Sequence, residues 1–431
     1  MASSNIENSL ASIYNDSQLS ALKQIKSEAL EEFKSNGLPP FKTEEYKFTP
    51  LGKVLEKNFS SVSTASSNFT KEEIFSKIID PEAAINLIFV NGQHRPELSS
   101  IGDLPEGIIL KDLEQALSDN EDEVKNHFGK YADYKMDAFT ALNTALASNG
   151  VFLLSEKNVV FDSPIYIYYF NDGTTNEGYS FPRNLVVAKA GSQVTFIEKA
   201  ITIGDNNSFF NPLSEIVVEP NANVHHVKIQ NDGPNSFEVC QTQVQQASDS
   251  TYSSYVISLD GAMIRNNLNI ASEGQNCESN MYGLYLLDGE THVDNHTTVD
   301  HIQPNSYSNE LYKGIMDDKS RGVFNGKIYV RQEAQKTNAF QSNNNILLSD
   351  NATINTKPQL EIWADDVKCS HGCTTGQLDE EAVFYLQARG IEKIKAKAML
   401  LYAFAHDIVE KIPVEIIRDR LDNFIFERLE N

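Results

Sequence analysis

The segment that divides this chain into two kinds of structure is Asp365-Asp366-Val367-Lys368-Cys369-Ser370-His371-Gly372-Cys373-Thr374-Thr375-Gly376-Gln377-Leu378-Asp379-Glu380-Glu381. Short runs of β-branched and aromatic residues precede it, and residues with helical periodicity follow it. The segment also brings two of the four cysteines and one of the nine histidines into five consecutive residues. It therefore marks a strand-to-helix junction that carries a cluster of soft metal ligands.

The region before this junction, from Val151 to about Trp363, is predicted to be a long series of strands. Runs such as 215–219 and 327–330 alternate with turns rich in Gly, Asn, Asp and Pro, and no helical pattern interrupts them. Most turn signals recur roughly 25 to 30 residues apart, which is the interval expected in a solenoid. A sandwich would need tight hairpin turns at closer spacing. The pattern favours a parallel β-helix, with a sandwich or barrel as the alternative. The turn signals include Pro220-Asn221, Asp249-Ser250, Asp288-Gly289 and Asp317-Asp318.

Both flanks of the strand-rich region are predicted to be mainly helical. Residues 10–33 have apolar side chains at helical spacing, residues 84–92 resemble a buried strand, and residues 137–147 resemble a helix. After Gln377, three helices carry apolar residues on one face, which must pack on the end of the solenoid or receive a partner. The predicted organisation is a helical region with a small α/β part at 1–150, a β-helix core at 151–368, and a C-terminal helical region at 369–431.

The composition of the chain argues against several classes of protein. The formal net charge of −24 argues against binding to nucleic acid, whose phosphates require a basic surface. Four cysteines in 431 residues do not form a disulfide framework, so the thiols are expected to be reduced. The N-terminus lacks the blocks of a signal peptide, and no apolar run is long enough to span a bilayer. We therefore expect a soluble cytoplasmic protein that binds neither nucleic acid nor membrane.

Cys369, His371 and Cys373 form the strongest candidate for a metal site. In an extended segment all three side chains point to the same side. Thiolate and imidazole suit zinc, copper(I) and iron–sulfur clusters, but three ligands fall short of the four of a closed zinc site. The missing ligand would come from elsewhere in the fold, from a partner chain or from solvent. The alternative is a structural role, with a buried thiol at a strand end and a helix-capping histidine.

Other groups are weaker candidates for chemistry. His292 and His296 share strand parity but His301 does not, and the adjacent His225 and His226 face opposite ways in a strand. The sequence contains no Walker P-loop, G-x-G-x-x-G or G-x-S-x-G motif. We therefore expect no bound nucleotide, and any dependence on ATP requires another subunit. Paired acids are expected as turns, so an enzyme that acts on polysaccharide rests only on analogy with other β-helices.

A set of segments, most of them in the C-terminal half, has the pattern of a known protein family. They are KTEEYKFT at 42–49, ELYKGI at 310–315, GVFNGKI at 322–328, AQKTNAFQ at 334–341, NNN at 343–345, PQLEI at 358–362, ADDVKCSHG at 364–372, GQLDEEA at 376–382, FYL at 384–386 and RG at 389–390. Together they resemble the SufB/SufD family of the SUF iron–sulfur cluster assembly machinery, and within it the SufD branch. The SufB branch normally has Glu-His-Glu-Ala in place of residues 369–372. Cys373 departs from the pattern, because many members have alanine there, and Tyr46 stands where the family has a tryptophan.

The resemblance implies a right-handed parallel β-helix between two helical regions. It also implies a non-catalytic scaffold that pairs with SufB through the β-helix and binds the SufC ATPase through the C-terminal helices. His371 would then join a SufB cysteine in holding a transient iron–sulfur cluster or iron, with Cys369 the second candidate and Cys373 the third. Exposed β-helix surface also suits a homodimer when the chain is isolated. The alternatives are a polysaccharide-active β-helix enzyme and a stand-alone metal-binding structural protein.

Overall fold

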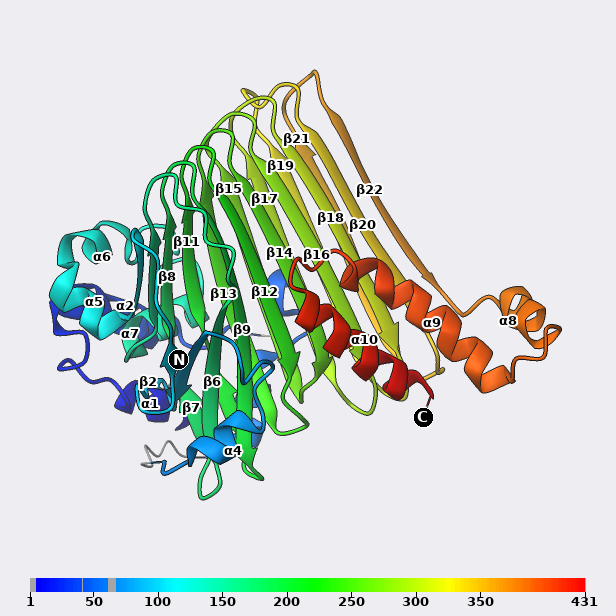
Figure 1. The fold of residues 1–431 in the computed structure, drawn as a ribbon, viewed down its shortest axis with the longest axis horizontal. Coiled ribbons are helices and arrows are strands. Elements are labelled where there is room, and N and C mark those ends of the chain that lie inside the picture. Colours follow the sequence, from blue (N-terminus) through cyan, green and yellow to red (C-terminus); the bar gives the residue numbers. More distant parts are fainter. Residues whose placement is uncertain (1–4, 41, 61–66, 431) are drawn as a thin grey trace.

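Two long, mostly parallel β-sheets face each other and form the body of the molecule (Figure 1). The computed structural model describes residues 5–40, 42–60 and 67–430. The first sheet has the strand order β2-β1-β6-β9-β12-β14-β16-β18-β20-β22, and the second has the order β21-β19-β17-β15-β13-β11-β8-β5-β4. From β11 onward, successive strands alternate between the sheets, so that each turn of the chain, here called a rung, adds one strand to each. The fold is therefore the parallel β-solenoid that the turn spacing predicts.

The strands of each sheet have the following bounds. In the first sheet they are β1 Ile85–Val90, β2 Gln93–His94, β3 Ser100–Ile101, β6 Ile165–Gly173, β9 Gln193–Gly204, β12 Asn223–Asn231, β14 Thr251–Asp260, β16 Glu278–Leu287, β18 Tyr307–Met316, β20 Asn338–Leu347 and β22 Lys368–Gly376. In the second sheet they are β4 Ile108–Asp112, β5 Val151–Ser155, β7 Gly178–Ser180, β8 Arg183–Ala188, β10 Ser208–Phe210, β11 Leu213–Val218, β13 Ser236–Gln246, β15 Met263–Ser272, β17 His292–His301, β19 Arg321–Val330 and β21 Thr353–Ile362.

Asparagine and aspartate residues fix the turns between rungs. Asn221, Asp249 and Asp318 have φ angles of 60°, 60° and 52°, a left-handed conformation that these two residue types adopt more readily than others. All three lie at turns predicted from the sequence. Inside the solenoid, Nδ2 of Asn266 donates a hydrogen bond to Oδ1 of Asn295 on the next rung at 3.0 Å. Such amide ladders hold adjacent strands in register.

The N-terminal helices cover the start of the solenoid (Figure 1). The predicted strand and helix of this region are confirmed as β1 and α7, and the Asp137 carboxylate caps α7. The buried carboxylate of Glu215 joins this region to the second sheet. It pairs with Nη2 of Arg183 at 2.6 Å and accepts a hydrogen bond from the backbone N–H of Gly129. The helices are α1 Asn5–Ser12, α2 Lys23–Asn36, α3 Leu51–Asn58, α4 Lys71–Phe75, α5 Leu113–Asp119, α6 Glu121–His127 and α7 Ala138–Leu146, with short 3-10 helices at Ser20–Leu22 and Glu44–Tyr46.

Residues 42–49 attach the N-terminal region to the second sheet far along the solenoid. The hydroxyl of Thr49 donates to Oδ2 of Asp294 at 2.5 Å, and Nη1 of Arg265 donates to the same oxygen at 2.7 Å. The Arg265 guanidinium also lies 4.6 Å from the ring centroid of Tyr46, within the range of a cation–π interaction. Burial opposes ionisation of Asp294, but the charge of Arg265 together with the contacts from His296 and Thr49 outweighs it, and the pKa of this carboxyl lies well below its ordinary value.

The C-terminal helices are α8 Glu380–Gln387, α9 Lys393–Val409 and α10 Glu415–Glu430. As predicted, α9 and α10 bury apolar faces, but they pack on the outer surface of the first sheet rather than on the end of the solenoid (Figure 1). The Lys313 ammonium on β18 pairs with the Asp407 carboxylate on α9. Ile394 is apolar but 61% exposed, because the start of α9 extends beyond the sheet. None of the helices in the described part of the chain has both the length and the apolar character needed to cross a membrane.

Candidate functional site

The three predicted ligand residues lie on β22, the last strand of the first sheet. Strand character thus continues past the boundary expected at residue 368, as far as Gly376. Parallel pairing places Cys369, His371 and Cys373 beside Ala339, Gln341 and Asn343 of β20. In β20 these three partners are buried, so they face the inside of the solenoid. All three ligand residues therefore occupy inward positions, on the same side of the strand as predicted.

These inward positions are accessible because no later rung covers them. The positions that precede His371 in the same column are Gln341, Glu310 and Met281, and each of them is buried. His371 itself is exposed at what is here called the open end of the solenoid, formed by β21 and β22 (Figure 1). The column of interior side chains thus ends in solvent, with a histidine as its last member.

The two thiols of β22 differ in their surroundings. Cys369 is half-buried and packs against an apolar cluster that includes Ile328 and Ala339, whereas Cys373 is exposed. Burial raises the pKa of the Cys369 thiol, and a backbone hydrogen bond from Ala339 acts weakly in the opposite direction. Without a bound cation, Cys369 is therefore expected to remain a neutral thiol at physiological pH.

Beneath the open end lies a floor of buried polar side chains. Nε2 of Gln341 donates a hydrogen bond to Oε2 of Glu310 at 2.6 Å. Complete burial raises the pKa of Glu310 to about 7. Next to them, Nδ2 of Asn343 donates to the hydroxyl of Tyr285 at 2.9 Å, and that hydroxyl donates to Oδ1 of Asn345 at 2.5 Å. The interior of the last rungs therefore contains a hydrogen-bonded network beside its apolar clusters.

Glycines make room for this network. A Cβ atom at Gly326 would lie 2.1 Å from Nε2 of Gln341, and one at Gly314 would lie 2.2 Å from the ring of Tyr285. Both distances are far below van der Waals contact, so only glycine fits at these two positions without displacing its neighbour. The segments at 310–315, 322–328 and 334–341, whose sequences resemble the SufB/SufD family, thus lie together in the same rungs.

Sequence reasoning did not identify Glu310 and Gln341 as site residues. The signal in the sequence is a spacing of one rung: Glu310 lies 31 residues before Gln341. His371 is the next residue in the same column. Recognising it required knowing which strands pair and in what register. Only the sheet topology supplies that information.

The other histidine groups are structural, as their strand positions suggest. His296 contacts Asp294 at 2.9 Å and His292 contacts the Thr49 hydroxyl at 2.9 Å, both on the outer side of β17. His301 faces the interior, where burial lowers its pKa to about 4. His226 is buried against Glu198 at 2.6 Å. Within residues 5–40, 42–60 and 67–430, no three histidine, cysteine or acidic side chains come together in one metal-binding group.

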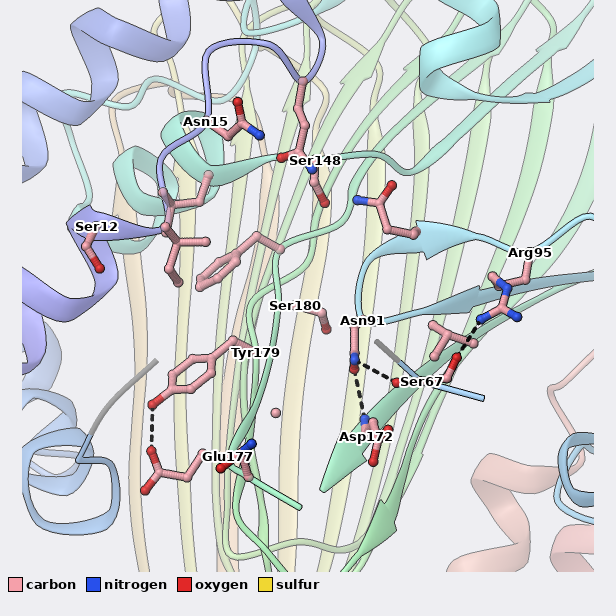
Figure 2. A pocket seen from close by; sticks show the side chains of 18 residues that line it. Ser12, Asn15, Ser67, Asn91, Arg95, Ser148, Asp172, Glu177, Tyr179 and Ser180 are labelled. Atoms are coloured by element: carbon pink, nitrogen blue, oxygen red, sulfur yellow. Dashed lines mark hydrogen bonds between the residues drawn. The ribbon is translucent and has the colours of Figure 1, made fainter. Parts of the chain in front are cut away.

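A large pocket lies at the other end of the solenoid (Figure 2). It has a volume of about 540 Å³ and is lined by polar side chains that include Asn91, Asp172 and Glu177. Glu177 accepts a hydrogen bond from Tyr179, and Asn91 accepts one from the backbone N–H of Asp172. Burial opposes ionisation of Asp172, but hydrogen bonds outweigh it and lower the pKa. Asp172 therefore does not have the raised pKa of a glycosidase general acid.

Comparison with known proteins identifies the family of this chain. The chain matches the SufBD protein N-terminal region over residues 7–167 and the SufBD core domain of SUF system FeS cluster assembly over residues 170–404. It is 34% identical to an iron–sulfur cluster assembly SufBD family protein of Synechocystis, over 88% of this chain and 84% of the relative. It is 31% identical to the iron–sulfur cluster assembly protein SufD of Escherichia coli, over 90% and 88% of the two chains. It is 29% identical to SufD of Bacillus subtilis, over 81% and 80%. The chain therefore belongs to the SufBD family of the SUF iron–sulfur cluster assembly system.

Proposed function

We propose that this chain is a non-catalytic scaffold subunit of SufD type, whose open solenoid end forms half of a site completed by SufB. The observation that carries the proposal is the column ending in His371, because its inward positions are buried in the preceding rungs and exposed in the last. Iron or a nascent iron–sulfur cluster is the cargo of this site. A neutral imidazole at His371 is the first ligand, and Cys369 is the second. Cys369 would lose its proton only when a metal binds.

The strand edges of the open end support pairing with SufB. In the two sheets, β21 pairs with β19 and β22 pairs with β20, and no other strand among the described residues pairs with the remaining edge of either. Unpaired edges of this length favour the addition of another chain. Beside them, Trp363 is 49% exposed and stacks on Tyr329, while the Arg331 guanidinium lies 5.1 Å from each ring. A rigid cluster of Trp, Tyr and Arg is typical of the residues that dominate interface affinity.

The C-terminal helices support binding of the SufC ATPase. Phe384 and Tyr385 on α8 are 71% and 57% exposed, and Ile394 at the start of α9 is also exposed. An exposed group of large apolar side chains marks a surface that another protein covers. The pairing of Lys313 with Asp407 connects α9 to β18, the strand that also carries Glu310. A movement of α9 driven by SufC would therefore reach the floor of the site through one strand.

The remaining features of the proposal follow from this assignment. SufC would supply the nucleotide chemistry, so this chain is expected to bind no nucleotide. In the absence of SufB, the edges of β21 and β22 could pair with a second copy, which is the homodimer expected of the isolated chain. The expected location is the cytoplasm, where cysteine thiols remain reduced.

The experiment is to co-express the tagged chain with SufB and SufC, purify the complex, and measure its iron and sulfide. The test variant is His371→Ala. The matched control is Ser370→Ala, which changes the adjacent exposed residue on the opposite side of β22. We expect His371→Ala to retain both partners and lose most of the iron and sulfide, while Ser370→Ala retains all of them.

Two results would contradict the proposal. Unchanged iron and sulfide in His371→Ala would remove the ligand role of this residue. Recovery of the chain as a lone metal-loaded monomer, without SufB or SufC, would instead support a stand-alone metal-binding protein.

A further inference from the structure

One buried acceptor next to the candidate ligand has no hydrogen-bond partner. Gln341 is 1% exposed, and among the described residues its Oε1 atom accepts no hydrogen bond. Its Nε2 atom donates to Glu310 on the preceding rung. A buried amide oxygen without a hydrogen-bond partner destabilises the folded protein, so it requires an explanation.

The orientation of the Gln341 amide follows from its neighbours. An ionised carboxylate only accepts hydrogen bonds, so the NH₂ group must face Glu310 when that residue is charged. The backbone of Gly326 lies close against the same Nε2 atom, where even a Cβ would come within 2.1 Å. Because the oxygen and nitrogen of an amide point in different directions, Oε1 is turned away from Glu310. The other strand beside β20 in this sheet is β22, and the residue in register with Gln341 there is His371.

His371 can reach this oxygen. Adjacent strands lie about 4.8 Å apart, and side chains at paired positions of a parallel sheet are direct neighbours. The imidazole is exposed, so it is free to change rotamer. Of the two ring nitrogens of a neutral histidine, one is a donor and the other is the lone pair that binds a metal.

We propose that Gln341, anchored by Glu310, is a positioning residue for His371: its Oε1 accepts the imidazole N–H and leaves the other ring nitrogen facing the open end. The arrangement fixes one tautomer before any metal arrives. Hydrogen-bonded partners behind metal-binding histidines act in this way, and their loss typically lowers metal affinity about 10- to 100-fold. The inference rests on the proposed ligand role of His371, which it deepens by naming the groups that orient the ring.

The first test needs no metal and no partner. The full chain is labelled with ¹⁵N-histidine, and the imidazole nitrogens are observed by long-range ¹H–¹⁵N NMR at pH 8, with the His371 signal assigned from its loss in His371→Ala. We expect a single tautomer in the unmodified protein. The variant Gln341→Met keeps the length of the side chain and removes the acceptor, so its His371 signals should move to the averaged positions of a tautomer mixture.

A charge-preserving exchange provides the rescue. In the double variant Glu310→Gln/Gln341→Glu, the amide at 310 donates to the carboxylate at 341, whose second oxygen still accepts from His371. This variant should restore the single tautomer. If Gln341→Met does not fold, Glu310→Met removes the anchor of the Gln341 amide and should mix the tautomers in the same way. A residue with only a packing role would give no such pattern of loss and rescue.

The second readout is iron in the complex with SufB and SufC. Gln341→Met should weaken iron binding about 10- to 100-fold, and the exchanged double variant should recover it. A single unchanged tautomer in a folded Gln341→Met protein would overturn this inference and leave the ligand role of His371 intact. If the tautomers respond as expected while His371→Ala retains its iron, the proposed function fails and the positioning contact stands.

Discussion

Glu310 provides the most quantitative prediction, because it is a carboxyl group kept fully inside the solenoid. Burial raises its pKa from an ordinary value of 4.5 to about 7. As the pH rises through 4.5, the unfolded chain loses this proton while the folded chain keeps it until about pH 7. The contribution of Glu310 to the free energy of unfolding is therefore at its maximum below pH 4.5. It declines between pH 4.5 and 7 and changes no further above that range.

The magnitude follows from the same linkage. A difference of one pKa unit is worth about 1.4 kcal/mol, so the decline totals roughly 3 kcal/mol, most of which falls between pH 5 and 8. The variant Glu310→Gln has nearly the same shape, has no proton to lose, and can still accept the hydrogen bond from Gln341. Relative to the unmodified protein, it should gain roughly 2 to 3 kcal/mol of unfolding free energy as the pH rises from 5 to 8.

The assay is urea unfolding followed by circular dichroism at several pH values, with the difference between variants taken at each pH so that all other titrating groups cancel. Glu361→Gln, which changes an exposed carboxylate at the end of β21, is the control and should run parallel to the unmodified protein. An infrared band of a protonated carboxyl at pH 6 that disappears in Glu310→Gln would identify the group directly. A pH-independent difference between Glu310→Gln and the unmodified protein would refute the reasoning, because it would mean that Glu310 is ionised in the folded state.

Three further predictions concern other parts of the molecule. Arg265→Met leaves the Asp294 carboxylate buried without its main counter-charge and should lower the free energy of unfolding by about 3 to 5 kcal/mol. The measurement is urea unfolding at pH 7, and a loss below about 1 kcal/mol would contradict the assigned ion pair. Lys313→Met removes the charged contact to Asp407 and should increase hydrogen exchange in α9 more than in β18, and equal exchange in both would exclude this contact as the attachment of α9. A thiol reagent should modify Cys369 and Cys373 of β22 in the folded protein, but the buried Cys240 and Cys277 only after unfolding. Reaction of Cys240 or Cys277 in the folded protein would be inconsistent with their burial.

The sequence alone was sufficient to predict the type of fold and that the three candidate ligands lie on one side of a strand. Turn residues such as Asn221 and Asp249 recur at the interval of a rung, and they work locally, because asparagine and aspartate tolerate a left-handed backbone wherever they occur. The alternation of side chains along a strand likewise predicts that Cys369, His371 and Cys373 share one side. Both inferences depend on residues that are close together in the chain.

Only the tertiary structure shows which residues surround the candidate ligands Cys369, His371 and Cys373. The sequence does not reveal that Gln341 and Glu310 lie behind His371, since the three residues belong to different rungs and meet only through the pairing of β18, β20 and β22. Nor does it reveal that Arg265, Asp294 and Thr49 form one buried cluster, because their contacts join segments separated by more than 200 residues. The physical reason is that sheet register and packing are set by the sum of many contacts across the whole solenoid, whereas turn and strand preferences are set by each residue and its neighbours.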